Sequence, residues 1–345
     1  MKPVKLGIVG CGVIGTHHVT EATNSPVVDL VAVSDMIEER AKSTAEKFGV
    51  STYYTNEDDL INDDRIEAVV LAMPTGVRTP IAFKVLGKGK HLIIEKPAAS
   101  NCAEIEKMIA MRGDLVVACC SSRNAFTGHA EVATKCVESG ALGKIRVVRF
   151  RAILSASPSP GDNPPPWRQS MKLNGGGILV NWSCYDLDYM MQITGWQLKP
   201  RVVLAKWWTI ADKMSAYVAP DSDADSHYTA FILCDDDIVL TMERGEFTSS
   251  ANSQAWEIIG TDGTLHLPLV TRSEVVLDKF ISGKGVVSET LAQDTYTGSS
   301  GVMENFVYAI RENKKPKTTL EQALVMQKIT DAIYESTRTG QAIVI

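Results

Sequence analysis

The chain has 345 residues, 45% of them hydrophobic and 22% charged, which is an ordinary composition for a soluble globular protein. At roughly 150 residues per domain, this length predicts two domains. The formal net charge of −6 excludes a broad basic surface of the kind that recruits nucleic acid or an anionic membrane. The sequence contains no run of about 18 apolar residues, so no membrane span is predicted. Seven cysteines without framework spacing indicate reduced thiols, and therefore a cytoplasmic protein.

Short apolar runs alternate with segments of helical period over the first third of the chain. Five runs are predicted to be buried parallel strands, at residues 4–9, 28–34, 68–72, 91–94 and 115–119. Four segments between them are predicted to be helices, at residues 13–23, 38–48, 80–88 and 103–112. This alternation predicts an α/β domain over residues 1–122, a doubly wound parallel sheet with helices on both faces.

The pattern changes after about residue 122, where strands follow one another with few helices between them. They are predicted at residues 144–154, 201–210, 227–234, 238–246 and 256–259. The turn Asp235-Asp236-Asp237 joins two alternating strands, which favours antiparallel pairing. Residues 123–345 are therefore predicted to form an α+β domain with a large, open, mainly antiparallel sheet that packs helices on one face. The other face is a candidate interface of a homodimer or homotetramer.

Two segments interrupt this order. Residues 155–166 are rich in proline and serine, and residues 283–300 are polar and rich in glycine, serine and threonine. Both are predicted to be long loops, which serve either as lids or subunit arms or simply as surface loops. Apolar residues recur at helical spacing over 319–338, which predicts an amphipathic helix near the end of the chain.

A glycine-rich turn follows the first predicted strand. In Gly10-Cys11-Gly12-Val13-Ile14-Gly15, the first glycine permits a tight turn, the second lets a pyrophosphate approach the backbone, and the third lets helix and strand close together. The N-terminus of the next helix would then offer free N–H groups and a partial positive charge to the phosphates. The sequence therefore predicts a dinucleotide site that includes Gly10, Gly12, Val13 and Ile14.

The choice of dinucleotide rests on the end of the second predicted strand. Asp35 stands where a carboxylate accepts hydrogen bonds from the ribose hydroxyls and repels a 2′-phosphate, which favours NAD over NADP. Met36 follows it in the same turn and is included in the expected cofactor site. Arg40 lies about one helical turn onward and complicates the choice, because arginine suits a phosphate.

A second motif, Glu95-Lys96-Pro97, follows the strand predicted at 91–94. It therefore lies at the carboxyl edge of the sheet, where doubly wound folds bind their ligands, with Lys96 directed toward the nicotinamide. Taken alone, this tripeptide is also typical of the polar residues that follow the end of any strand.

These motifs together resemble the Gfo/Idh/MocA family, the group of glucose–fructose oxidoreductase and inositol dehydrogenase. Three later segments are also similar to those of the family. They are Trp167-Arg168 ahead of Gly175-Gly176-Gly177, residues 258–265, and residues 332–340 near the end of the chain. It implies an N-terminal Rossmann domain that binds NAD and a C-terminal domain whose open sheet mediates oligomerisation. The reaction that it implies is hydride transfer at a carbon of a sugar or polyol.

The resemblance also implies roles for single residues. Many relatives carry Asp-x-Gly-x-His-x-x-Asp where this chain has Asn181, Ser183, Tyr185 and Asp188, and a subset uses tyrosine in place of the acid/base histidine. Lys96, Tyr185 and Asp188 are thus the implied catalytic residues, with the proton passing to Tyr185 or Lys96. Asn181 replaces the usual aspartate contact to a substrate hydroxyl, and an amide can still donate and accept there.

Further contacts follow from the same resemblance. Pro74 and Thr75 are implied to join Glu95 and Lys96 in the cofactor site. Arg78 stands in place of a histidine found in relatives, and it is either a contact to an acidic group or, more simply, a solvated helix residue. The implied substrate-binding residues are Lys96, Arg123, Trp167, Arg168, Asn181 and Tyr185.

The sequence is therefore interpreted as an NAD-dependent oxidoreductase of sugars or polyols. Three alternatives stay open: a glycosidase that oxidises its sugar transiently with bound NAD, an oxidoreductase that never releases its nucleotide, and a dinucleotide sensor without catalysis. No cluster of cysteine and histidine with ligand spacing is present, so no metal site is expected, and the histidines are given no role.

Overall fold

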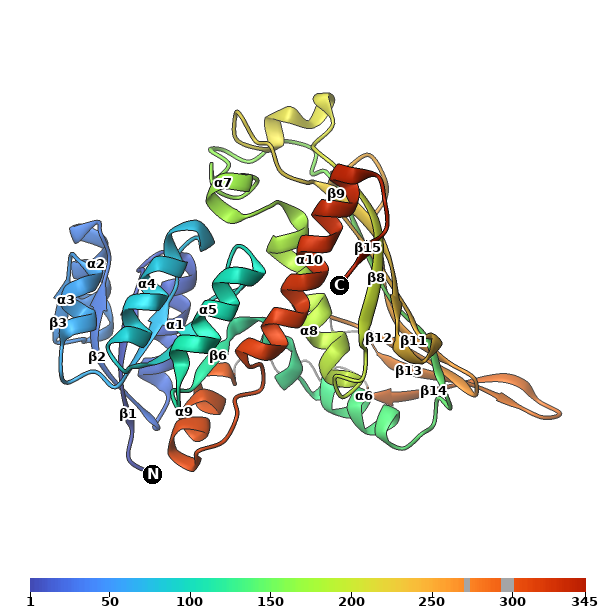
Figure 1. The fold of residues 1–345 in the computed structure, drawn as a ribbon, viewed down its shortest axis with the longest axis horizontal. Helices are drawn as coiled ribbons and strands as arrows, with labels where there is room; N and C mark the ends of the chain where they lie inside the picture. The colour runs from blue at the N-terminus through green and yellow to red at the C-terminus, as the bar shows by residue number, and fades with distance from the viewer. Residues whose placement is uncertain (270–273, 293–300) are drawn as a thin grey trace. The chain divides into compact units, whose positions relative to one another are not determined.

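The computed structural model describes residues 1–269, 274–292 and 301–345 (Figure 1). The chain divides into two compact units, Met1–Ser122 with Ser300–Val325 and Arg123–Ser299 with Met326–Ile345. The C-terminal range expected from the sequence, 123–345, is therefore interrupted. The reason is α9 (Val302–Glu312), which packs against two strands of the first unit, β5 and β6.

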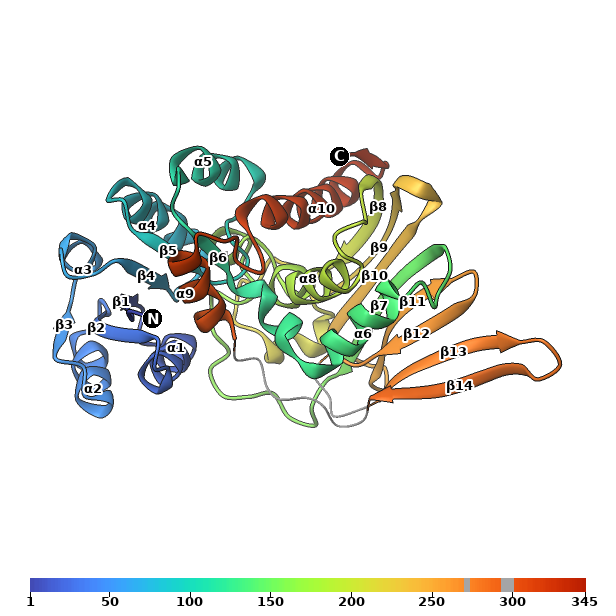
Figure 2. The ribbon, with the colours of Figure 1, turned by 90° about the horizontal axis from the view of Figure 1, so that it is seen from below.

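The first unit is built on a six-stranded sheet in the order β3-β2-β1-β4-β5-β6, and every neighbouring pair runs parallel. Its strands are β1 (Val4–Val9), β2 (Val28–Ser34), β3 (Thr52–Tyr54), β4 (Ala68–Leu71), β5 (His91–Ile94) and β6 (Val117–Cys119). The helices between them are α1 (Val13–Asn24), α2 (Glu38–Phe48), α3 (Glu57–Asn62), α4 (Thr75–Gly87) and α5 (Cys102–Arg112). Figure 2 shows α1 and α2 on one side of this sheet and α4 and α5 on the other, which confirms the doubly wound arrangement.

Two features of this unit differ from the sequence-based expectation. The short elements β3 and α3 were not expected, because three and six residues are too few to establish a period. The helix expected at 80–88 begins earlier, at Thr75, and includes Pro80 in its interior. Buried Arg78 anchors its first turn by donating to the Met73 and Pro97 carbonyls.

The second unit is built on a nine-stranded sheet in the order β14-β13-β12-β11-β7-β10-β9-β8-β15. β7 and β10 pair parallel and the other neighbours pair antiparallel, so the mainly antiparallel sheet is confirmed. Its strands are β7 (Ile145–Ser155), β8 (Pro200–Trp208), β9 (His227–Cys234), β10 (Val239–Thr248), β11 (Ser253–Gly260), β12 (Gly263–Leu267), β13 (Val275–Ile281), β14 (Gly285–Ala292) and β15 (Ile343–Val344).

Part of the loop expected at 283–300 is instead a strand. Residues 285–292 form β14, which pairs with β13 as an extended hairpin, and residues 293–300 lie outside the described residues. Most of β14 is exposed, so its sequence lacks the alternation that marks a half-buried strand. The loop expected at 155–166 is irregular in structure after Ser155, the last residue of β7.

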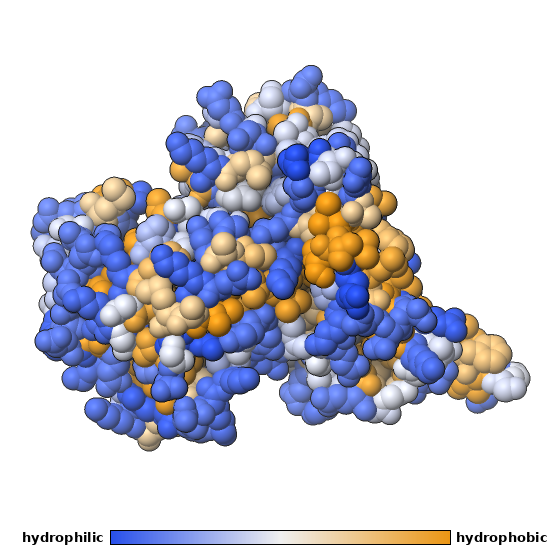
Figure 3. Space-filling model, in the orientation of Figure 1, coloured by the Kyte–Doolittle hydropathy of each residue, from blue (hydrophilic) through white to orange (hydrophobic). Residues whose placement is uncertain are grey.

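Helices cover one face of the large sheet. These are α6 (Gly128–Glu138), α8 (Cys184–Ile193) and the C-terminal part of α10 (Leu320–Thr339), which confirms the amphipathic helix expected there (Figures 1 and 2). On the opposite face, Leu204, Trp208, Phe231 and Leu233 are 45–51% exposed. Figure 3 shows hydrophobic side chains gathered over β8 and β15, at this edge of the sheet. Among the described residues, no helix is long and apolar enough to cross a membrane.

Candidate functional site

The glycine turn is a tight connection that needs glycine at two positions. Gly10 has φ +98°, and a Cβ added to it would lie 2.4 Å from the Ala72 carbonyl oxygen. A Cβ on Gly15 would lie 1.7 Å from the Gly10 carbonyl oxygen. Any larger residue would therefore push α1 away from the strands β1 and β4.

The N-terminus of α1 has the features of an anion site. The helix begins at Val13 with no side-chain cap at Gly12 and no acidic residue in its first turn, so its positive end is not compensated. An added Cβ at Gly12 would meet nothing within 4 Å, and Val13 is 89% exposed. The space and the charge both fit a pyrophosphate against this backbone.

Asp35 lies beside this turn with its carboxylate fixed. Its Oδ2 accepts the Cys11 backbone N–H at 2.8 Å, and its Oδ1 accepts the Ile37 N–H at 2.9 Å. A carboxylate oxygen has further lone pairs, so these bonds orient the group and still leave acceptors for ribose hydroxyls. Met36 next to it is 90% exposed, and Arg40 is exposed on the first turn of α2.

Glu95 and Lys96 follow β5 at the same edge of the sheet as the glycine turn, which follows β1. The Glu95 carboxylate is buried; its Oε1 lies 2.9 Å from His18 Nε2, and its Oε2 accepts the Lys96 backbone N–H at 3.1 Å. His18, on α1, thus holds the carboxylate that in turn holds the Lys96 backbone.

The sequence analysis gave His18 no role, and the structure shows it bonded to Glu95 at the edge of the sheet. Burial disfavours its imidazolium, but bonds to Cys120, Glu21 and Glu95 outweigh that effect and raise the pKa of His18 well above its ordinary value. His18, Glu95 and Cys120 have ligand atoms within 4.8 Å of one another, a grouping able to hold a metal ion. His18 is 77 residues from Glu95 and 102 from Cys120, so no local spacing could reveal the cluster.

Arg78 is buried rather than solvated, contrary to the simpler of the two expectations. It is 2% exposed, and its guanidinium donates to the Met73 carbonyl at 2.6 Å and to the Pro97 carbonyl. It also reaches the hydroxyl of Thr75, the first residue of α4, at 3.3 Å. Pro74 caps that helix without a side-chain bond. Arg78 therefore connects the Pro74–Thr75 turn to the Glu95-Lys96-Pro97 segment.

In the second unit, Tyr185 lies on the first turn of α8 and is 6% exposed. The Arg123 guanidinium lies over its ring, 5.2 Å from the centroid, and Trp182 packs edge-on at 5.8 Å. The structure thus brings together two of the expected site residues, Tyr185 and Arg123.

A buried ion pair fixes the helix that carries Tyr185. Asp186 is fully buried and accepts from Arg244 Nε at 2.5 Å, from Arg244 Nη2 at 2.9 Å and from Trp256 Nε1 at 2.8 Å. These bonds tie α8 to β10 and β11 and fix the rotation of the helix. Asp188, on the same helix, is also fully buried. Sequence reasoning missed Asp186 because Arg244 and Trp256 are 58 and 70 residues away.

Asn181 belongs to a turn of π-helix, Leu179–Ser183, that leads into α8. Its Nδ2 donates to the Arg168 carbonyl at 2.8 Å, and its Oδ1 accepts from Asn174 Nδ2 at 3.0 Å. The structure therefore brings Asn181 and Arg168 together through the backbone of Arg168. Trp167, the preceding residue, is 39% exposed.

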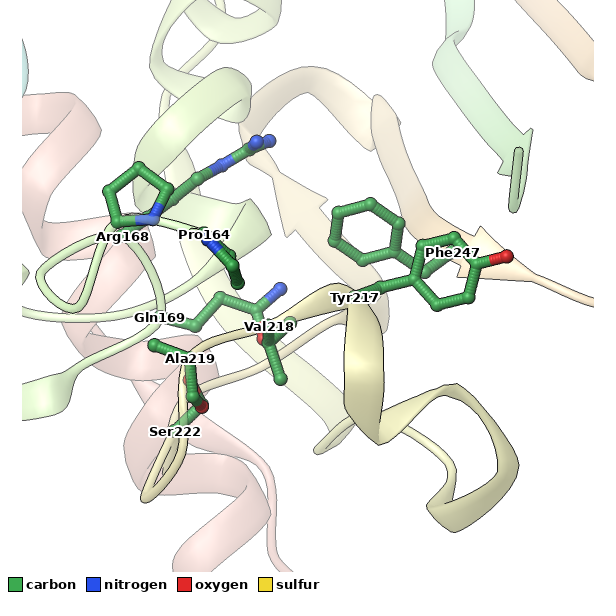
Figure 4. Close-up of a pocket in the computed structure, with 9 residues that line it drawn as sticks. Pro164, Arg168, Gln169, Tyr217, Val218, Ala219, Ser222 and Phe247 are labelled. Atoms are coloured by element: carbon green, nitrogen blue, oxygen red, sulfur yellow. The ribbon is translucent and has the colours of Figure 1, made fainter. Parts of the chain in front are cut away.

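A small cavity, open to solvent, lies next to this segment (Figure 4). Its lining residues are Pro164, Pro165, Arg168, Gln169, Tyr217, Val218, Ala219, Ser222 and Phe247. Behind it, the buried Glu246 carboxylate accepts from Arg168 Nη2 at 2.5 Å and from Gln169 Nε2 at 2.7 Å. Of the expected substrate residues, Arg168 lines this cavity and Trp167 does not.

A parallel sheet with a glycine turn after β1 and a fixed acid after β2 defines the class of dinucleotide-binding Rossmann domains. Residues 4–118 match the family described as "Oxidoreductase family, NAD-binding Rossmann fold", and residues 131–266 match the "GFO/IDH/MocA C-terminal domain". The chain belongs to the GFO/IDH/MocA oxidoreductase family, and its N-terminal unit is that family's NAD-binding domain.

Several characterised proteins are similar over most of their length. Myo-inositol 2-dehydrogenase of Thermotoga maritima is 29% identical over 287 residues, which cover 79% of this chain and 78% of that protein. D-xylose 1-dehydrogenase (NADP(+)) 2 of Haloferax volcanii is 24% identical and covers 98% of each chain. The solved structure of levoglucosan dehydrogenase with NADH and levoglucosan is 21% identical, covers 100% of each chain and has a TM-score of 0.84.

Proposed function

We propose that this protein transfers hydride between NAD and a hydroxyl-bearing carbon of a sugar or polyol. One observation carries the proposal: the glycine turn and the Glu95–Lys96 pair lie at the carboxyl ends of β1 and β5, on one edge of a single parallel sheet. Nucleotide and the Lys96 ammonium would therefore share one side of the first unit. The relatives named as inositol and xylose dehydrogenases support the substrate class.

Bound NAD would supply the hydride acceptor. Lys96 would hold the reacting hydroxyl and stabilise the negative charge that develops on its oxygen during oxidation. Tyr185 would accept the alcohol proton, with Lys96 as the other group able to do so. Asp188 would complete the proton-handling set. Glu95 serves Lys96 indirectly, because its carboxylate holds the Lys96 backbone N–H.

The remaining expected residues would bind and orient the sugar. These are Arg123, Trp167, Arg168 and Asn181. Asn181 already donates to the Arg168 carbonyl, so its amide would position the Trp167–Arg168 segment as well as contact a hydroxyl.

We further propose that NAD is preferred to NADP. The Asp35 carboxylate is 8% exposed and held by two backbone N–H groups, so it cannot swing away from a 2′-phosphate. The proposed cofactor contacts are Gly10, Gly12, Val13, Ile14, Asp35, Met36, Arg40, Pro74, Thr75, Glu95 and Lys96.

We also propose that the protein is a cytoplasmic homodimer or homotetramer without a nucleic-acid partner. All seven cysteines lie among the described residues and none forms a disulfide bond there, which suits a reducing compartment. Apolar side chains on β8 and β9 face outward on the open side of the large sheet, where a second copy would cover them.

A screen of sugars, polyols, their keto forms and glycosides tests the proposed function. Both NADH and the organic product are measured, with and without added nucleotide. Oxidation of a sugar or polyol with stoichiometric NADH supports the proposal. Glycoside cleavage without net NADH, or nucleotide binding with no product in any assay, would overturn it in favour of the alternative activities.

A further inference from the structure

The guanidinium of Arg78 joins two loops that leave neighbouring strands at the carboxyl edge of the first sheet. β4 and β5 pair parallel, with Leu71 opposite Ile94 at their ends. Nη1 of Arg78 donates to the Met73 carbonyl at 2.6 Å, in the loop after β4, and Nη2 donates to the Pro97 carbonyl, in the loop after β5. Because a guanidinium presents its N–H groups from a rigid planar fork, it holds two acceptors at a set separation.

Burial makes this bridge stronger than a surface contact. Arg78 is almost fully buried, and an arginine is rarely found there unless its guanidinium is bonded, because taking its charge out of water is costly. A carbonyl that lost this donor would also be left buried or half-buried without one, which is costly in turn. The two loops are therefore tied to each other through a single side chain.

Lys96 lies between two backbone bonds made by buried charged groups. On its N-terminal side, Glu95 Oε2 accepts the Lys96 backbone N–H at 3.1 Å, and the same carboxylate is bonded to His18 at 2.9 Å. On its C-terminal side, Arg78 binds the carbonyl of the next residue, Pro97. Because the backbone is held on both sides of Lys96, the direction in which its side chain leaves the chain is held as well.

The same guanidinium reaches the proposed cofactor site. Arg78 Nη2 donates to Thr75 Oγ1 at 3.3 Å, and Thr75 is the first residue of α4. Thr75 is among the proposed cofactor contacts, and Lys96 is proposed to hold the reacting hydroxyl. One side chain therefore connects a residue of the nucleotide site with the segment that would hold the substrate oxygen.

We propose that Arg78 is a positioning residue for hydride transfer, which sets the place of the Lys96 side chain relative to the Pro74–Thr75 turn. The inference rests on the proposed function, because it takes Lys96 as the group that holds the reacting oxygen. Arg78 itself is too buried to contact a ligand, so it acts through the segments that it binds. A misplacement of about 1 Å in a catalytic group can cost roughly 10²-fold in rate, so loss of Arg78 should lower kcat and leave binding nearly unchanged.

The test compares Arg78→Met and the milder Arg78→Lys with wild type and with Arg311→Met. Arg311, on α9, is a matched control because its guanidinium also donates to two backbone carbonyls of the first unit, those of Lys2 at 3.0 Å and Pro3 at 2.8 Å. It also pairs with Glu67. Lys2 and Pro3 precede β1, at the amino end of the sheet, so Arg311→Met removes comparable bonds away from the carboxyl edge.

Single-turnover hydride transfer is measured with the sugar or polyol that the wild type oxidises. Arg78→Met should lower the rate by about 10- to 100-fold, and Arg78→Lys, which keeps the charge without the planar fork, by a smaller factor. NADH affinity and sugar Kd should stay within about threefold of wild type. Arg311→Met should lower the thermal midpoint and leave the rate unchanged.

Three results would overturn the inference. They are a rate within about twofold of wild type in Arg78→Met, a loss confined to binding, and an equal loss of rate in Arg311→Met. If Arg78→Met does not fold, Arg78→Lys decides by the same criteria.

Amide hydrogen exchange supplies a readout that needs neither substrate nor nucleotide. When the Pro97 carbonyl is released, the neighbouring bond from the Lys96 N–H to Glu95 should open more often. Exchange at the Lys96 amide should therefore become about 10-fold faster in the Arg78 variants and stay unchanged in Arg311→Met. Exchange no faster than in Arg311→Met would overturn the inference even if the rate falls. If the wild type oxidises no sugar or polyol, the proposed function fails instead, and exchange alone decides whether Arg78 holds the Lys96 segment.

Discussion

Replacing His18 tests how the edge of the Rossmann sheet is held together. The side chains of His18 and Glu95 are 3% and 6% exposed, and their hydrogen bond is 2.9 Å long. Removing one partner of a buried ion pair typically costs about 3–5 kcal/mol, because the other charge stays buried. In His18→Gln the Lys96 backbone N–H still donates to one Glu95 oxygen, which places the expected loss at the lower end of this range. We therefore expect His18→Gln to lower the free energy of unfolding by about 3 kcal/mol.

The adjacent histidine is a matched control. His17 is 45% exposed and pairs with Glu21 at 3.3 Å on the surface of the same helix. Exposed pairs contribute at most about 1 kcal/mol, so His17→Gln should change stability far less than His18→Gln. Both variants keep a polar side chain at the position, so they differ in burial and in the partners lost: Glu21, Glu95 and Cys120 at His18, and Glu21 alone at His17.

The effect of His18 should also depend on pH. Its pKa is raised in the folded protein, where Glu21 on α1, Glu95 after β5 and Cys120 after β6 contact it. The imidazolium therefore stabilises the fold fully below the unfolded pKa of about 6.5, and this contribution is lost as pH rises through the folded pKa. Urea denaturation at several pH values gives the free energy of unfolding of each protein. The difference in this free energy between wild type and His18→Gln should become smaller above about pH 6.5. The stabilising role of His18 would be refuted if His18→Gln lost no more free energy of unfolding than His17→Gln, or if its loss increased with pH.

Three further predictions concern the cofactor, the proton and the assembly. Asp35→Ser should narrow the preference for NAD over NADP by roughly 10- to 100-fold in kcat/KM, because it removes a charge opposed to the 2′-phosphate; an unchanged ratio would contradict the assigned role. Tyr185→Phe should reduce kcat by roughly 10²–10⁴-fold, and adding Lys96→Met should make it little worse than Lys96→Met alone, as for residues that act as a unit. Phe231→Lys should shift the assembly toward the 37.6 kDa monomer by light scattering, and a wild type that is already monomeric would remove the proposed interface.

Much of the first unit was predictable because its elements are long and strongly patterned. The bounds of β2 and α2 follow from an uninterrupted apolar run and a helix closed by Gly49 in the left-handed conformation. β14 was not predictable, because a strand exposed on both faces has no alternation to detect.

The candidate site was predictable only where local motifs mark it. The glycine turn and Asp35 are close enough in sequence to be recognised together, and the structure joins them through the Cys11 N–H. The partners of Glu95 and Asp186 lie far along the chain, so their pairing depends on the folded sheet. Arg78 was misplaced for a similar reason, since it binds backbone carbonyls that leave no mark in the sequence.

Nothing in the sequence pointed to Gln169, which lines the cavity. Its amide bonds to Glu246, 77 residues further along the chain, and the neighbouring Phe247 has φ +55° where the pairing of β10 with β7 shifts register at a bulge. A bulge is a property of strand pairing, and no single-strand pattern predicts it.

The most direct test of the central claim is single-turnover hydride transfer in Lys96→Met. NADH affinity is measured on the same protein by fluorescence titration, because the glycine turn and Asp35 hold the nucleotide without the lysine side chain. The account predicts that NADH affinity stays within a few-fold of wild type, while hydride transfer from the substrate sugar or polyol is nearly abolished. Full transfer rates in Lys96→Met would contradict the mechanism.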